Sequence, residues 1–255
     1  MTGLDPSGAG AVSPLGHYGE AMGSPKGMGI AAPRLRPQLA EATLRTDGLE
    51  DESLLSELAL TDLDLGGLAA EHVEFSGCRL TGCKLSGSEL DKLNLVDVRL
   101  DRCDLANARW ADALMTRVAI TSSRLTGLAG PGMNLQHVTV TDSVLDFVSF
   151  RFAKFVRVEF SDCRLANADF VAADLRGTVF RRCDLSAVEF SQVKATDAVF
   201  VDCQWDGTRG VASLAGATIA NSSPTDHLAV AAAMAWALNI KLADPADLPD
   251  DHGTR

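Results

Sequence analysis

Residues 161–190 read SDCRL ANADF VAADL RGTVF RRCDL SAVEF, six consecutive groups of five that each end in Leu or Phe. This large apolar residue, which we call the centre, recurs at every fifth position from Leu65 to Trp205. Leu, Phe, Ile, Met or Trp occupies 25 of these 29 positions. A period of five fits neither a helix, which needs about 3.6, nor a flat strand, which needs about two. It predicts a coil that turns a corner every five residues and points the centre and the small residue two before it inward.

A longer period of 20 lies above the period of five. Centres that are 20 positions apart tend to be the same residue, so four sides of five residues make one turn, and like residues stack on like residues. The predicted structural core is therefore a set of columns: Leu85, Leu105, Leu125, Leu145, Leu165 and Leu185; Phe150, Phe170 and Phe190; Phe160, Phe180 and Phe200.

The repeat of a small residue, then Asp or Asn, then Leu or Phe resembles the pentapeptide-repeat family. Direct matches are Cys103-Asp104-Leu105, Ala168-Asp169-Phe170 and Cys183-Asp184-Leu185. The resemblance covers residues 54–220 and implies an all-β solenoid, a right-handed quadrilateral β-helix. The sequence has no glycine-rich phosphate-binding loop and no nucleophile motif, so we expect neither catalytic activity nor a bound cofactor.

The regions outside the repeat define the expected domain organisation. Residues 1–37 are rich in Gly, Pro, Ser and Met and predict a disordered tail. Residues 38–60 predict a cap or first coil, and residues 61–220 the β-helix itself. Residues 221–242 predict a C-terminal helix, followed by a tail over 243–255.

The predicted C-terminal helix begins at a start signal, Ser223-Pro224-Thr225-Asp226. From His227 to Ile240 it has no charged residue and is apolar nearly all round. Such a helix covers the last coil with one face and meets a second copy with another, and the resemblance also implies a homodimer through this end. The candidate dimer interface is Leu228, Val230, Met234, Trp236 and Leu238.

Charge and hydropathy argue against a nucleic-acid-binding protein, a membrane protein and a secreted protein. A net charge of −11 argues against direct nucleic-acid binding, which needs clustered Lys and Arg. No apolar run reaches the roughly 18 residues of a membrane span, and no secretory signal precedes the repeat. We therefore expect a cytoplasmic protein.

All six cysteines lie two positions before a centre, and Cys83, Cys103, Cys163, Cys183 and Cys203 share one phase of 20. One interpretation is a thiol ladder for metal or redox chemistry. The other is a column of small core residues, which we favour because Ala, Val and Ser fill the same slot elsewhere. The five histidines show no metal-ligand spacing, so no metal site is predicted.

Two classes of function remain open. The best-known activity of the family is to bind bacterial DNA gyrase or topoisomerase IV as a DNA mimic, which protects the enzyme from antibiotics. Residues 61–210 hold 21 acids against 17 bases, however, and acids and bases are mixed along the columns. The alternative is a structural or scaffold repeat protein with another protein partner.

One surface feature departs from the repeat. Phe147 and Phe152 lie two positions after a centre, in a phase that points outward. Together with Asp142 and Asp162 they form the candidate partner surface. The alternative is that both rings fold over a corner of the coil.

Overall fold

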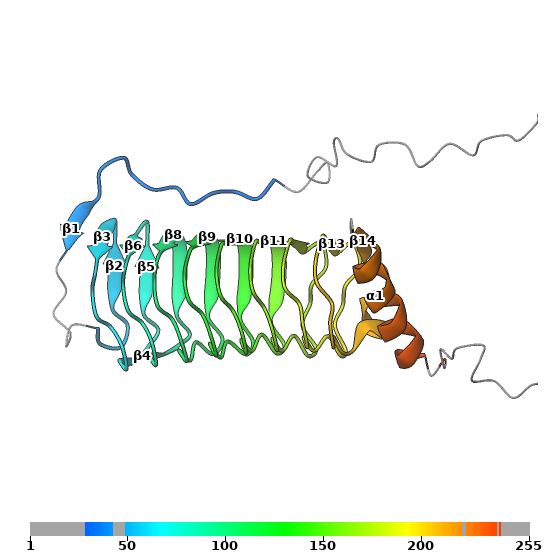
Figure 1. The fold of residues 1–255 in the computed structure, drawn as a ribbon. Coiled ribbons are helices and arrows are strands. Elements are labelled where there is room, and N and C mark those ends of the chain that lie inside the picture. The colour runs from blue at the N-terminus through cyan, green and yellow to red at the C-terminus, as the bar shows by residue number, and fades with distance from the viewer. Residues whose placement is uncertain (1–28, 43–48, 221–222, 239, 241–255) are drawn as a thin grey trace, which may run out of the picture.

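This computed structural model describes residues 29–42, 49–220, 223–238 and 240. A residue in the left-handed backbone conformation turns the chain at each corner. Every fifth residue from Glu52 to Gly207 has a φ between 48° and 71°. These residues turn the chain, so that four corners close one turn of 20 residues. The result is a parallel β-solenoid with one C-terminal helix, which confirms the expected β-helix (Figure 1).

Main-chain hydrogen bonds join each turn to the next. The N–H of Leu65 donates to the carbonyl of Lys84 (2.7 Å), whose own N–H donates back to the carbonyl of Leu63 (2.8 Å). Strand pairing keeps the same offset of 20, as in Leu135 beside Phe155. The strands are β1 Ala40–Ala42, β2 Leu54–Ser56, β3 Leu58–Thr61, β4 Ala69–Glu71, β5 Glu74–Ser76, β6 Arg79–Thr81, β7 Glu89–Asp91, β8 Asn94–Asp101, β9 Leu114–Thr121, β10 Asn134–Thr141, β11 Lys154–Ser161, β12 Val179–Arg181, β13 Val199–Val201 and β14 Thr218–Ala220.

The centres fill the interior of the solenoid. Each of the Leu and Phe columns named above is at most 3% exposed. The rings of Phe160, Phe180 and Phe200 stack face to face, with centroids 5.1 Å and 4.9 Å apart and interplanar angles of 8° and 3°. Identical side chains stack because a parallel register places equivalent residues directly above one another.

Two departures from the five-residue repeat leave the hydrogen-bond ladder between turns intact. At Gly130 the centre has no side chain, and the Met133 side chain occupies the space that a Cβ there would need. After Gly210 the phase moves by one, because the short 3-10 helix η1 (Val211–Leu214) takes the place of a corner, and Phe200 pairs with Ile219. A Cβ on Gly210 would overlap the backbone of Phe190 and Ser191.

The two ends are closed differently. At the start, β1 pairs with β3, with Ala40 beside Leu58, and so covers the edge of the first turn. At the other end, helix α1 (Pro224–Ala237) lies across the last turn, and its Val230 packs into the core.

The prediction of a disordered tail is wrong for residues 29–37. This segment runs along the outside of the rod and bonds to it, since the Ala31 N–H donates to His137 and the Arg34 N–H to Asp97. Its composition indicated disorder, but the acceptors that hold it lie far away in the sequence. Residues 1–28 lie outside the described part of the chain, as do the predicted tail (243–255) and the last two residues of the predicted helix segment (241–242).

Leu145 gives a direct test of the buried columns. Leu145→Ala removes a side chain that is fully buried, so we expect a loss of about 2–5 kcal/mol in the free energy of unfolding. Leu114→Ala, the same change at a side chain that is 48% exposed, serves as the control and should cost under about 0.5 kcal/mol. Denaturant unfolding measures both, and equal losses would show that Leu145 does not face the interior.

Candidate interaction surfaces

Two aromatic rings stand out from the surface at successive corners of one turn. Phe147 and Phe152 are each 63% exposed, and their φ angles are 57° and 60°. A left-handed backbone costs a non-glycine residue about 1–2 kcal/mol, and Gly, Asn or Asp would tolerate it better. Neither local conformation nor burial therefore favours phenylalanine at these corners.

Arg151 completes this surface, which we call the Phe patch (Phe147, Phe152 and Arg151). Its guanidinium carbon lies 5.8 Å from the centre of the Phe152 ring, and its Nη1 donates to Asp169 Oδ2 at 2.8 Å on the next turn. The ring and the carboxylate thus fix the arginine in place. Arg151 was not among the predicted residues, although its place directly before Phe152 is a signal that the sequence carries.

The two acids predicted beside the aromatic rings have different surroundings. Asp142 occupies the corner before Phe147 and is exposed. Asp162 lies above it on the next turn, where Arg182 donates to both of its oxygens at 2.6 Å and 2.7 Å. This pairing lowers the pKa of Asp162, so that its charge is already neutralised.

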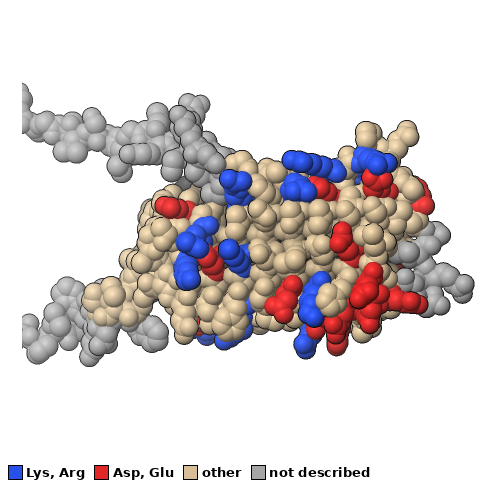
Figure 2. All heavy atoms as spheres, turned by 180° about the vertical axis from the view of Figure 1, so that it is seen from behind, with Lys and Arg blue, Asp and Glu red and all other residues tan. Residues whose placement is uncertain are grey.

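Ion pairs between turns neutralise much of the acidic surface. Figure 2 shows Lys and Arg interspersed with Asp and Glu along the back of the rod. Many arginines bind an acid one turn away or nearby, as in the pairs Asp104–Arg124, Asp146–Arg164, Glu159–Arg181 and Glu189–Arg209. The charge that a partner meets is thus smaller than the composition indicates.

On the face that Figure 2 shows, acids gather at the end formed by the first turns. Asp51, Glu71, Glu89 and Asp91 line a hollow of about 240 Å³ there. Asp51, Glu71 and Asp91 are 20 residues apart and stack on three successive turns. These three acids were not among the predicted residues, although the same step of 20 that connects the core residues connects them.

The thiols lie inside the solenoid. All six cysteines are buried and unbridged. The Cys78 thiol donates to the carbonyl of Leu55, and burial raises its pKa. Hydrogen bonding with Cys183, together with burial, raises the pKa of Cys163. In the two gaps of the column, Ser123 and Ser143 donate to the carbonyls of Thr121 and Thr141.

The C-terminal helix divides its apolar residues between two sides. Val230 is 7% exposed and packs into the core, so its place in the predicted dimer interface is wrong. Leu228 and Leu238 are 67% and 66% exposed, and Met234 is 36% exposed. Met234 and Leu238 border a hollow of about 220 Å³ against the last turn. The Trp236 side chain lies outside the described part of the structure.

Within the described ranges, no group of three His, Cys, Asp or Glu side chains is placed to hold a metal ion. No described helix has both the length and the apolar composition that a membrane crossing requires.

Comparison with known proteins places these features in context. A family model described as pentapeptide repeats matches residues 143–182 and 163–202, with 8 copies of the repeat. Among solved structures, HetL from the cyanobacterium Nostoc sp. strain PCC 7120, a pentapeptide-repeat protein involved in heterocyst differentiation regulation, is 19% identical. The match covers 66% of this chain and 87% of HetL, with a TM-score of 0.38.

A second similar structure is a trypsin-treated form of QnrB1, a plasmid-mediated fluoroquinolone resistance protein. It is 18% identical, over 75% of this chain and 99% of QnrB1, with a TM-score of 0.41. Endo-xylogalacturonan hydrolase from Aspergillus tubingensis is 12% identical, over 73% of this chain and 70% of the hydrolase, with a TM-score of 0.33. The comparison with curated proteins gave no match.

The cysteine column yields a chemical test. Because all six thiols are buried, we expect slow reaction with a thiol reagent at neutral pH. This includes Cys83 and Cys203, whose pKa values are lowered by hydrogen bonding with Cys103 and Cys183. In denaturant all 6 should react at once. Mass spectrometry of the labelled protein counts them, and rapid labelling of several cysteines in the folded protein would contradict the core interpretation.

Proposed function

Because the chain belongs to the pentapeptide-repeat proteins, we propose that it is a non-enzymatic binding rod that recognises a protein partner through the Phe patch. The observation that carries this proposal is the pair of exposed rings at adjacent corners, beside an arginine that Asp169 holds. Aromatic residues and arginine dominate the energetics of protein interfaces because they bury large areas with few rotatable bonds.

The rigidity of the rod supports the same proposal. The main-chain ladder continues from turn to turn, so the patch is held by the scaffold rather than by a long loop. A preformed surface loses little conformational entropy on binding. The proposed setting is the cytoplasm, where thiols stay reduced.

DNA gyrase or topoisomerase IV is the specific partner that we propose, with the rod acting as a DNA mimic. The acidic hollow of Asp51, Glu71, Glu89 and Asp91 supports this choice, since three of its carboxylates recur at intervals of one turn. Two of them already pair with cations, Glu71 with Lys92 at 3.8 Å and Asp91 with Arg109 at 3.6 Å. The ion pairs over the other turns favour the alternative, a scaffold for a different protein. An array of paired charges resembles the DNA backbone poorly.

The Phe patch is tested by the double variant Phe147→Ser/Phe152→Ser. Both side chains are exposed, so the fold should persist, whereas partner capture from a cell extract should fall at least tenfold. The matched control, Asn167→Ser/Ala172→Ser, changes the same two corners one turn later and should capture the partner normally. If all three proteins capture the same set equally, the patch is not the binding surface.

The partner's identity is settled by a supercoiling assay with purified gyrase, with and without a quinolone. If gyrase is the partner, wild-type protein alters supercoiling or its inhibition, and the double variant does not. An unchanged assay would exclude gyrase and leave the scaffold alternative, with the captured protein as its partner.

We also propose that the protein is a homodimer through α1. Leu228 and Leu238 leave apolar surface at the end of the rod, and symmetric pairing is the commonest way to bury such surface. Leu228→Ser/Leu238→Ser should then give a monomer in light scattering. Leu54→Ser, at a side chain that is 66% exposed near the opposite end, is the control and should stay dimeric. The reverse result would place the interface at the N-terminal end.

A further inference from the structure

One corner column of the solenoid already holds an extended segment of the chain. We call residues 29–39 the N-terminal arm, and it runs along the outside of the rod towards β1 (Figure 1). The column beneath it consists of residues 20 apart: Glu57, Gly77, Asp97, Arg117, His137, Arg157, Gly177 and Asp197. All of them occupy the left-handed corner position, so they form one line parallel to the rod.

Acceptors for the arm recur on every second turn of this column. The N–H of Ala31 donates to His137 Nδ1 at 3.0 Å, and the N–H of Arg34 donates to Asp97 Oδ1 at 2.9 Å. Two turns further on, Arg36 Nε pairs with Glu57 Oε1 at 2.7 Å. The column therefore accepts hydrogen bonds from main-chain N–H groups that are three residues apart in the arm. At one end of the column, Glu57 pairs with a basic side chain.

The spacing of the two partners explains this match. Three residues of a polyproline II chain advance about 9.3 Å, and two turns of a β-solenoid advance about 9.6 Å. Pro33 and Pro37 restrict φ to the range of that conformation. An extended proline-containing segment therefore stays in register with the column over several turns.

Arginines on neighbouring turns influence both acceptors, and one of them binds its acceptor directly. Arg117 donates to both oxygens of Asp97 at 2.6 Å, and the two side chains are only 23% and 16% exposed. Arg157 Nη1 lies 3.2 Å from His137 Nε2, but Nε2 carries the ring proton when Nδ1 accepts from Ala31, so these two side chains share no hydrogen bond. Burial and the nearby Arg157 charge lower the pKa of His137, which keeps its ring neutral, so that Nδ1 accepts a hydrogen bond.

The arm itself is weakly held. None of residues 29–37 is buried, and its anchors are two main-chain hydrogen bonds and one exposed ion pair. Exposed pairs contribute at most about 1 kcal/mol each. A competing segment with the same spacing could replace it.

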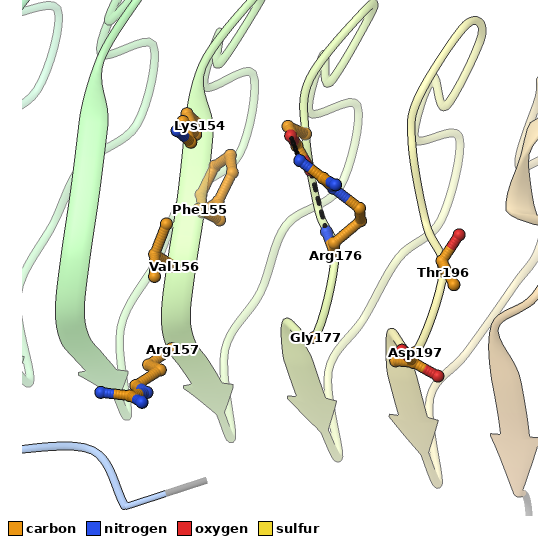
Figure 3. Close-up of a pocket in the computed structure, with 9 residues that line it drawn as sticks. Lys154, Phe155, Val156, Arg157, Arg176, Gly177, Thr196 and Asp197 are labelled. Carbon is orange, nitrogen blue, oxygen red and sulfur yellow. Dashed lines mark hydrogen bonds and ion pairs between the residues drawn. The ribbon is translucent and has the colours of Figure 1, made fainter.

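The column also extends beyond the arm. Arg157, Gly177 and Asp197 border a hollow of about 430 Å³ together with Lys154 and Arg176 (Figure 3). Arg176 binds Asp174 at 2.8 Å and 2.7 Å, whereas Lys154 forms no ion pair with the residues described. An acidic side chain on a bound segment would find a cation here.

We propose that this column is a docking strip for an extended, proline-containing segment of a partner protein, and that the N-terminal arm is its built-in competitor. The partner segment carries N–H groups three residues apart, a basic residue at the Glu57 end and an acidic residue at the Lys154 end. This strip lies on a different corner from the Phe patch and does not depend on it.

The test uses the full chain and a fluorescent peptide with the sequence of residues 29–39. In the variant Ala31→Pro/Arg34→Pro, both donor N–H groups of the arm are lost, so the arm should leave the strip. The peptide should then bind at least tenfold more tightly than to wild type, whose tethered arm competes at a high effective concentration. Fluorescence anisotropy measures both affinities.

A second peptide, with proline at the positions of Ala31 and Arg34, is the control and should not bind. Adding Asp97→Ala and His137→Ala to the released variant should also abolish binding of the first peptide. The proposal is overturned if the first peptide binds wild type and released variant equally, or binds neither, or if the proline control binds as well as the first peptide.

Discussion

The left-handed residue at every fifth position is the constraint on which the structure depends. It turns the chain at each corner, and four such turns return it above its starting point after 20 residues. Only then can N–H and carbonyl groups of successive turns pair, and only then do the centres converge on one axis. Asp, Asn, Arg and even Phe accept this conformation because the ladder on both sides fixes the backbone.

The same geometry determines where function can reside. Two of every five side chains point inward and pack in the core. All six cysteine side chains are among them, so their thiols are shielded from solvent. The corner residue always points outward, and corners 20 apart form straight lines along the rod. The docking strip and the Asp162–Arg182 pair are built on such lines, whereas the rings of the Phe patch lie on two neighbouring lines. A change at one corner therefore alters the surface while leaving the core intact.

The distribution of charged side chains follows from the same stacking of corners. Stacked corners of equal charge would repel at the spacing of one turn, and arginine beside aspartate relieves that repulsion, as Arg182 does for Asp162. In the hollow at the first turns acids stack on acids, and cations beside the stack relieve the repulsion there: Lys92 lies 3.8 Å from Glu71, and Arg109 lies 3.6 Å from Asp91. Long-range interactions between paired charges are weak in salt, so shape and the exposed rings contribute more to specificity than net charge.

The sequence by itself determined the β-helix, its step of 20 and the buried Leu and Phe columns, because each follows from a strictly local repeat. Regular spacing decides which way a side chain points, and no distant contact is needed to predict it. The exposed rings of Phe147 and Phe152 followed from the same phase. Only the tertiary structure decided the place of the N-terminal arm, the partner of Arg151 and the inward turn of Val230. These depend on residues up to 106 positions apart, as between Ala31 and His137. Such contacts form only after the coil has brought the corners into line, and no local pattern encodes them.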